Sequence, residues 1–230
     1  MKLLLLSGYF ILIFSCKSND TALLSYSNAF KSTVGYKMEL KSKSLTVTTE
    51  ADFNIDSVSN GLLKVNTIIN KMTWQDGGSD IEKDQNNHLK QFTGVPYYFE
   101  MDSTGKIIKP LTNKETNEDA SKIFDVKLFF PGYPAGLIKA GEKWEGSRQI
   151  HDMVFASVKT TSTLNKIDGD NCYVNMQYRF VEDTKMFTKK FEGLYLIDKN
   201  TGLLTSGNLL ISGFNGFSNT SGTIQISRII

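Results

Sequence analysis

The sequence has few of the residues that build most catalytic and metal sites. It contains two cysteines, two histidines and four prolines among 230 residues. His88 and His151 lie in polar stretches without a neighbouring cysteine or carboxylate pair, so we interpret both as surface or turn residues. No His-Glu-x-x-His, Cys-x-x-Cys, Gly-x-Ser-x-Gly or glycine-rich phosphate motif occurs. These absences argue against a metal- or nucleotide-dependent enzyme, and we expect no enzymatic activity and no cofactor.

An excess of charge of either sign is also missing. The chain carries 26 Lys and Arg against 24 Asp and Glu. No basic stripe appears, and basic residues do not interleave with aromatic ones, so we expect no nucleic-acid partner. Apolar residues make up 40% of the chain and aromatic residues 11%. This is enough for a packed core in one large domain or in two small ones.

One apolar run stands at the N-terminus, where Lys2 is followed by the uncharged residues 3–14. A helix of this length spans about 18 Å, well short of the hydrocarbon core of a bilayer, which is about 30 Å thick. The run therefore predicts a signal peptide over residues 1–15 and not a permanent membrane span.

The end of this run, Ile13-Phe14-Ser15-Cys16, resembles the lipobox of bacterial lipoproteins. Ile13 matches the aliphatic residue three before the cysteine and Ser15 the small residue before it, whereas Phe14 is bulkier than usual. The resemblance implies cleavage before Cys16 and a lipid, such as palmitate, on that residue. Two or three acyl chains, at about 0.8 kcal/mol per buried CH₂, hold a protein firmly on a membrane. The alternative is an ordinary secretory signal in which Cys16 is incidental.

A polar segment, Lys17-Ser18-Asn19-Asp20, follows the expected lipid site. We therefore expect a lipidated cysteine and tether over residues 16–32. Lys17 is not the Asp that resembles an inner-membrane retention signal at this position. This favours the outer membrane of the cell envelope, at its periplasmic face or at the cell surface.

The rest of the chain shows the alternation of a β protein. Apolar side chains at 45, 47, 51, 53 and 55 follow the period of a half-buried strand. Asn60-Gly61, a strong hairpin signal, separates this run from residues 63–74. Similar runs cover residues 155–164, 172–181, 186–197, 203–211 and 223–229, and no proline interrupts them.

Two pairs of segments are similar to each other. Residues 35–39 read like residues 141–145, and residues 99–108 read like residues 195–204. In the second pair a strand enters a turn at Asp102 or Asp198, whose side chain is expected to cap the turn amides before a Thr-Gly. We therefore predict a domain over residues 33–230 with similar halves, about 33–112 and 138–212. Chance resemblance among hairpins is the alternative.

The expected fold is mainly β: curved antiparallel sheet from two similar halves, half-barrel or sandwich-like, with one short helix between them. Asn117 is the expected cap of that helix, and Pro131 follows its end. Residues 75–87 are polar and contain glycine, which predicts an exposed, mobile loop. Residues 76–84 offer oxygen ligands for Ca²⁺. They lack EF-hand spacing and include Lys83, so we expect no metal site.

These landmarks resemble a family of uncharacterised, duplicated β-rich lipoproteins common in Bacteroidota. Its motifs correspond here to residues 35–36, 101–107, 131–134 with 141–144, and 198–202. The arrangement is also similar to the half-barrel of lipid- and lipoprotein-carrying envelope proteins. That second similarity concerns fold alone, and fold does not establish function.

Two functions remain open at this point. The strands are rich in aromatic residues and methionine, which form a core or line a groove for an apolar ligand. We favour an anchored lipoprotein that binds a lipid or other apolar ligand, and expect Cys172 to be a small core residue. The alternative is a structural or adhesion-like module that recognises a protein or glycan at the cell surface. Apart from Cys16 as the lipid site, the sequence identifies no ligand-binding residue.

Overall fold

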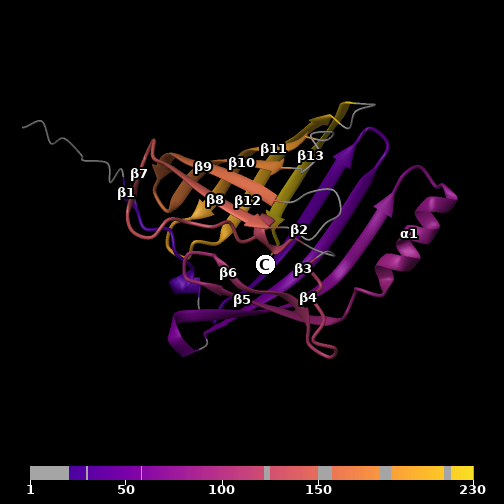
Figure 1. Cartoon of the computed structure of the whole chain (residues 1–230), viewed down its shortest axis with the longest axis horizontal. Helices are drawn as coiled ribbons and strands as arrows, with labels where there is room; N and C mark the ends of the chain where they lie inside the picture. Colours follow the sequence, from indigo (N-terminus) through magenta and orange to yellow (C-terminus); the bar gives the residue numbers. More distant parts are fainter. Residues whose placement is uncertain are drawn as a thin grey trace, which may run out of the picture.

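The computed structural model describes residues 21–29, 31–57, 59–121, 125–149, 157–181, 188–214 and 219–229. Its main element is an antiparallel sheet of 11 strands in the order β6-β5-β4-β3-β2-β13-β12-β11-β10-β9-β8. Figure 1 shows that this sheet is curved. The mainly β, curved antiparallel fold expected from the sequence is confirmed. Cys16, the expected signal peptide and His151 lie outside the described residues.

Each half of the chain contributes a run of neighbouring antiparallel strands. The first half forms β2 (Thr33–Ser42), β3 (Thr46–Ser57), β4 (Leu62–Gln75), β5 (Pro96–Asp102) and β6 (Ile107–Asn113). The second half forms β8 (Lys143–Gln149), β9 (Ser157–Asp168), β10 (Asn171–Val181), β11 (Thr188–Asp198), β12 (Leu204–Phe214) and β13 (Asn219–Arg228). β13 pairs with β2 and so joins the two runs into one sheet. The duplication itself stays a prediction.

Extra residues in two strand pairs help to bend the sheet. In the β3–β4 pair, Glu50 faces Lys71 and Ala51 faces Ile69, so Asn70 has no partner in the register. In the β9–β10 pair, the register shifts in the same way around Asn165. Such bulges bend a strand and increase its local twist.

The segments that contain Tyr26 and Tyr133 hold the turns at Asp102 and Asp198 together. Both aspartates cap their turns as expected: Oδ1 of Asp102 accepts from the amide of Thr104 at 2.9 Å, and Oδ1 of Asp198 from that of Asn200 at 2.8 Å. The Tyr26 amide donates to the Ser103 carbonyl at 2.8 Å, beside the first turn.

A second tyrosine, Tyr133, reaches both turns. Its amide donates to the Thr104 carbonyl at 2.7 Å, and its hydroxyl donates to the Gly202 carbonyl at 2.6 Å. The Tyr133 ring stacks on that of Tyr26 with centroids 5.1 Å apart. Gly105 has a φ of +81°, and a Cβ there would lie 2.6 Å from the Pro131 carbonyl oxygen. The close approach of these segments therefore requires glycine at position 105.

The expected tether over residues 16–32 is wrong in its C-terminal part. Residues Thr21–Ala22 form β1, which pairs with β7 (Ile138–Lys139), and Tyr26–Ala29 form a 3-10 helix. Ala22, Leu24 and Tyr26 are buried. Burying these apolar side chains is favourable, so residues 21–29 pack as part of the domain.

The connection between the halves contains a short helix, but it begins later than expected and has a different cap. The helix is the 3-10 turn Val126–Leu128, and the Asp125 side chain accepts from the Lys127 amide at 3.1 Å. Asn117, the expected cap, instead has a φ of +60° and donates its amide to the Asn113 carbonyl at 3.0 Å. Asn117 therefore ends a turn that follows β6.

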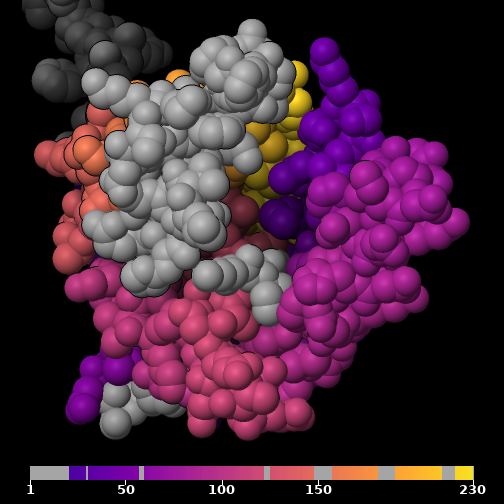
Figure 2. All heavy atoms as spheres, turned by 45° about the vertical axis from the view of Figure 1, so that its right-hand side comes forward, coloured from indigo at the N-terminus to yellow at the C-terminus, as the bar shows by residue number. Residues whose placement is uncertain are grey.

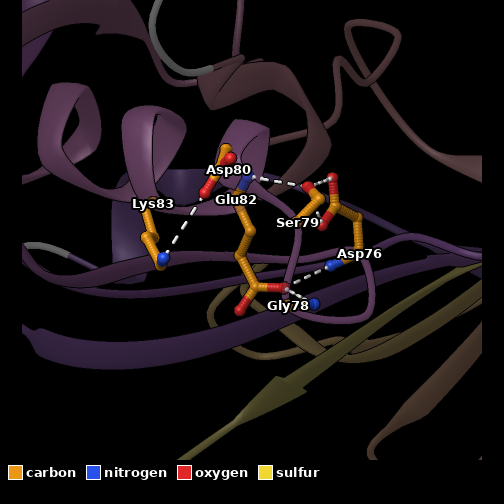
Figure 3. Close-up of polar contacts among 6 residues, drawn as sticks. All are labelled: Asp76, Gly78, Ser79, Asp80, Glu82 and Lys83. Atoms are coloured by element: carbon orange, nitrogen blue, oxygen red, sulfur yellow. Dashed lines mark hydrogen bonds and ion pairs between the residues drawn. The ribbon is translucent and has the colours of Figure 1, made fainter.

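The predicted loop over residues 75–87 is wrong, because it contains most of helix α1 (Asp80–Lys90). Figure 3 shows the contacts that start this helix. The Ser79 hydroxyl accepts from the Glu82 amide at 3.1 Å, and the Glu82 carboxylate accepts from the amides of Asp76 and Gly78 at 2.9 and 2.7 Å. Ser79-x-x-Glu82 is a capping-box spacing, so the signal for the helix was present in the sequence.

Helix α1 protects an exposed edge of β4. β5 pairs with β4 only from Leu62 to Ile68, which leaves the last part of β4 without that neighbour. The Asn86 amide occupies this edge: its oxygen accepts from the Trp74 amide at 2.8 Å, and its nitrogen donates to the Trp74 carbonyl at 2.7 Å. These two bonds imitate those of a neighbouring strand. Such cover keeps an edge from pairing with other chains.

Replacing Asn86 with alanine is expected to expose this edge. Losing two hydrogen bonds of about 1 kcal/mol each should increase amide exchange at the end of β4, residues 69–75, by about 10- to 30-fold. Hydrogen–deuterium exchange read by mass spectrometry measures the effect. Asn87→Ala is the matched control, since Asn87 is exposed on the same helix and its side chain accepts a hydrogen bond from Lys90 at 3.4 Å. Equal exchange in both variants would contradict the edge role of Asn86.

Candidate ligand-binding groove

The inner face of the curved sheet is closed at one end. Phe129 and Phe130, which follow the 3-10 turn between the halves, are buried. The Phe130 ring lies 5.1 Å from that of Phe53 and 5.5 Å from that of Phe99, measured between centroids. The Phe129 ring lies 5.5 Å from that of Tyr36. These contacts pack one end of the inner face with buried aromatic side chains.

Further along the same strands, the inner face is only partly covered. Side chains alternate along a strand, so Met38 and Leu40 share the face of buried Tyr36. Phe191 stands opposite Ile211 in the β11–β12 register. The Phe180 and Phe191 rings contact each other with centroids 4.9 Å apart. We call five partly buried residues the apolar groove: Met38, Leu40, Phe180, Phe191 and Ile211.

Figure 2 shows the surface hollowed beside the magenta part of the molecule, with yellow and indigo segments at the bottom of the depression. Gly222 faces Ile211 across the β12–β13 pair and adds no side chain to this floor. The partly covered inner face of the sheet is therefore concave and apolar, as most ligand-binding sites are.

A cavity of about 330 Å³ adjoins the apolar groove, and we call it the side pocket. It lies between β8–β10, the connection at residues 127–134 and the β5–β6 turn. Its walls include apolar side chains, the hydroxyls of Thr160 and Ser162, and charged side chains. Other residues that line the side pocket are Lys106, Lys127, Tyr133, Pro134, Trp144 and Tyr178.

The side pocket and the apolar groove share a wall. Tyr178 lines the side pocket and stands directly opposite Phe191 in the β10–β11 register. The Trp144 indole is held in place because its Nε1 donates to the Gly132 carbonyl at 2.9 Å. An elongated ligand in the apolar groove would therefore reach the side pocket along Tyr178.

Two tyrosine hydroxyls deep in the fold already have protein partners. The Tyr195 hydroxyl donates to the Leu128 carbonyl at 3.0 Å and lies 3.5 Å from the Tyr178 hydroxyl. Burial raises the pKa of Tyr195 well above its usual value, so this phenol stays neutral at physiological pH. These groups stabilise the wall and are not poised for acid–base chemistry.

Cys172 lies in β10 and is fully buried at 0% exposure, as a core residue. Burial raises the pKa of its thiol to about 11. Since the thiolate is the reactive form, we expect Cys172 of the folded domain to react with a maleimide at pH 7.5 at least 100-fold more slowly than in urea. Mass spectrometry of the labelled protein measures the two rates. Fast labelling of the folded protein would contradict the core assignment.

The acidic loop considered for Ca²⁺ uses its side chains to begin helix α1 (Figure 3). The Ser79 hydroxyl donates to the Asp76 carboxylate at 2.7 Å, and this bond lowers the pKa of Asp76. Lys83 pairs with Asp80 at 3.4 Å. Within the ranges that the structure describes, no group of three or more His, Cys, Asp or Glu side chains is arranged to hold a metal ion.

His88 is exposed near the end of α1, where its ring contacts Phe92 and Gln91. This position agrees with the surface histidine expected from the sequence. His151 falls outside the described residues.

The sequence identified many aromatic and methionine residues but could not separate core from groove. Phe53, Phe99 and Tyr195 are core, whereas Phe180 and Phe191 belong to the apolar groove. Leu40 and Ile211 were missed because single aliphatic residues in a strand carry no signal of exposure. The side pocket was missed because its walls come from three separate parts of the chain.

Comparison with known proteins adds no further constraint. No protein-family model matches the chain, and no curated protein is similar enough to be a relative. Among the described residues, no helix has both the length and the apolar character needed to cross a bilayer.

Proposed function

We propose that the chain is a non-enzymatic, membrane-anchored lipoprotein that binds a lipid or another apolar ligand. One observation supports this above all: Met38, Leu40, Phe180, Phe191 and Ile211 lie on one face of the curved sheet, and their apolar side chains are only partly buried. Covering apolar surface contributes about 25 cal/mol per Å². A bound acyl chain would remove this surface from water.

The side pocket suits the polar end of such a ligand. Lys106 is exposed and Lys127 is half-buried at its wall. A cavity of about 330 Å³ is at the small end of the range for ligand sites, about 300–1,000 Å³. It therefore fits a head group better than a whole lipid. The ligand favoured here is an amphiphile with one acyl chain and a carboxylate or phosphate head group.

Binding of a fluorescent fatty acid tests the groove. The described sheets and core lie between Thr21 and Ile229, so a domain that starts at Thr21 retains them. Titration with cis-parinaric acid should give saturable one-site binding that unlabelled fatty acid displaces. A linear, unsaturable signal would contradict ligand binding. Absence of turnover of generic ester and glycoside substrates by the same sample is the expected result for a non-enzyme.

The anchor is tested on the full chain. We propose that a lipid on Cys16 holds the protein at the outer membrane, facing the periplasm or the cell surface. Mass spectrometry of the N-terminal peptide should find a diacylglyceryl- and acyl-modified Cys16 as the first residue. A peptide that begins elsewhere, or an unmodified Cys16, would contradict the anchor. Cys16→Ser should move the protein from the membrane fraction to the soluble fraction.

A further inference from the structure

Two exposed leucines flank the small β1–β7 sheet, because Leu23 follows β1 and Leu137 precedes β7. Thr21 faces Lys139 and Ala22 faces Ile138 in its antiparallel register. Continuing this register brings Leu23 opposite Leu137. Leu23 is 54% exposed and Leu137 is 71% exposed, the highest value for a large apolar side chain in the described part of the chain. We call these two residues the leucine patch.

Leu23 and Leu137 each lie in a stretch of sequence without charged residues. Residues 21–30 contain no charged side chain, and neither do residues 128–138. Ala135, Gly136 and Leu137 form an exposed turn between buried Tyr133 and buried Ile138. Exposed turns of domains in water are normally polar. An uncharged, apolar turn is instead suited to an apolar environment, since no charge must lose its hydration there.

The leucine patch lies close to Thr21, the first described residue, and in the same segment as part of the side pocket. Figure 1 shows β1 and β7 together at one end of the molecule, with α1 at the opposite end. Tyr133 and Pro134 line the side pocket, and Leu137 follows them in the same segment. Cys16 precedes Thr21 by five residues, which span at most about 18 Å when fully extended.

We propose that Leu23 and Leu137 dock the domain on the bilayer by entering the outer part of its acyl-chain region. This inference rests on the proposed anchor at Cys16, because a lipid there would keep the patch within one short tether of the membrane. The absence of charge from both segments selects a lipid surface as the partner. Lys139, exposed beside the patch, can extend its ammonium to the head groups. Docking in this way brings the side pocket next to the lipids that the groove is proposed to bind.

An environment-sensitive label tests the docking directly. Leu137→Cys in the full chain is labelled with nitrobenzoxadiazole and reconstituted in vesicles of phosphatidylcholine and phosphatidylglycerol. Leu210→Cys is the matched control, because Leu210 is 59% exposed and lies on β12, in the main sheet. Cys172 is buried and is not expected to take the label.

The label at position 137 is expected to shift to shorter wavelength, brighten several-fold and be quenched by spin-labelled lipid. The label at 210 should keep its aqueous spectrum. An aqueous spectrum at 137, or equal shifts at both positions, would overturn the proposal. A spectral shift at position 137 that appears without vesicles and grows with protein concentration would also overturn it. The leucine patch would then bind a second copy of the chain. The mass of the N-terminal peptide reports the anchor separately, and fatty-acid titration reports the groove. Failure of either is therefore distinguishable from failure of the leucine patch.

Discussion

Replacing Phe191 and Ile211 with serine is expected to weaken binding of a fluorescent fatty acid by about 30-fold. The two side chains stand opposite each other on neighbouring strands and are partly buried, so each still exposes apolar surface to a ligand. A loss of about 1 kcal/mol of apolar contact at each position gives about 2 kcal/mol in total, which is roughly 30-fold in affinity. Titration of the domain that starts at Thr21 measures the change.

The same strands provide a matched control. Leu194 on β11 and Leu210 on β12 are exposed, and their positions alternate with Phe191 and Ile211, so they point to the outer face. Leu194→Ser with Leu210→Ser should leave the affinity within about two-fold of the original. If the outer-face variant loses as much binding as the inner-face variant, the ligand does not occupy the groove.

Phe130→Ala is expected to lower the free energy of unfolding by about 3–5 kcal/mol, the range for losing a fully buried aromatic ring. Phe130 is 0% exposed and its ring contacts those of Tyr26, Tyr36, Phe53 and Phe99. These four neighbours lie on separate segments of the chain, so they cannot all move into the space that the ring leaves. Urea unfolding followed by circular dichroism measures the difference.

Ile81→Ala is the control for this loss. Ile81 is 61% exposed on α1, so its replacement should change the stability by less than about 0.5 kcal/mol. A similarly small change in the free energy of unfolding for Phe130→Ala would contradict the view that the connection between the halves packs against one end of the inner face.

Local patterns in the sequence were sufficient to predict most strands. The alternation at residues 45–55 corresponds to β3, and Asn60 and Gly61, both with positive φ, lie in the turn between β3 and β4. The two Asp turns were predicted from the side chains that cap them. Each of these features is decided by residues that are near one another in the chain.

Contacts between distant segments could not be predicted in this way. The pairing of β13 with β2 brings together strands that are about 180 residues apart in the sequence, and no local pattern specifies this pairing. Tyr26 resembled part of a tether, because its hydrogen-bond partner, the Pro131 carbonyl, is remote in sequence. Helix α1 is a different case, since Ser79-x-x-Glu82 was available and was outweighed by the polar, glycine-containing composition.

The division of the inner face into core and groove also depends on a distant segment. Phe129 and Phe130 pack against Tyr36 and Phe53, whereas Leu40 and Phe191 are only partly buried. Along β2, the same alternation therefore produces a buried tyrosine at one end and a partly buried leucine at the other. A strand pattern reports which face is apolar, and only the fold decides what covers that face.

The most direct test of the account is to ask whether the purified domain carries a lipid. The domain that starts at Thr21 is prepared without detergent, and solvent extracts and the intact complex are analysed by mass spectrometry. The account predicts an acyl-bearing amphiphile near one per protein, and its loss from the variant with serine at 191 and 211. A domain that is free of lipid, and remains so after incubation with envelope lipids, would contradict the account. Recognition of a protein or glycan at the cell surface would then be the function to test.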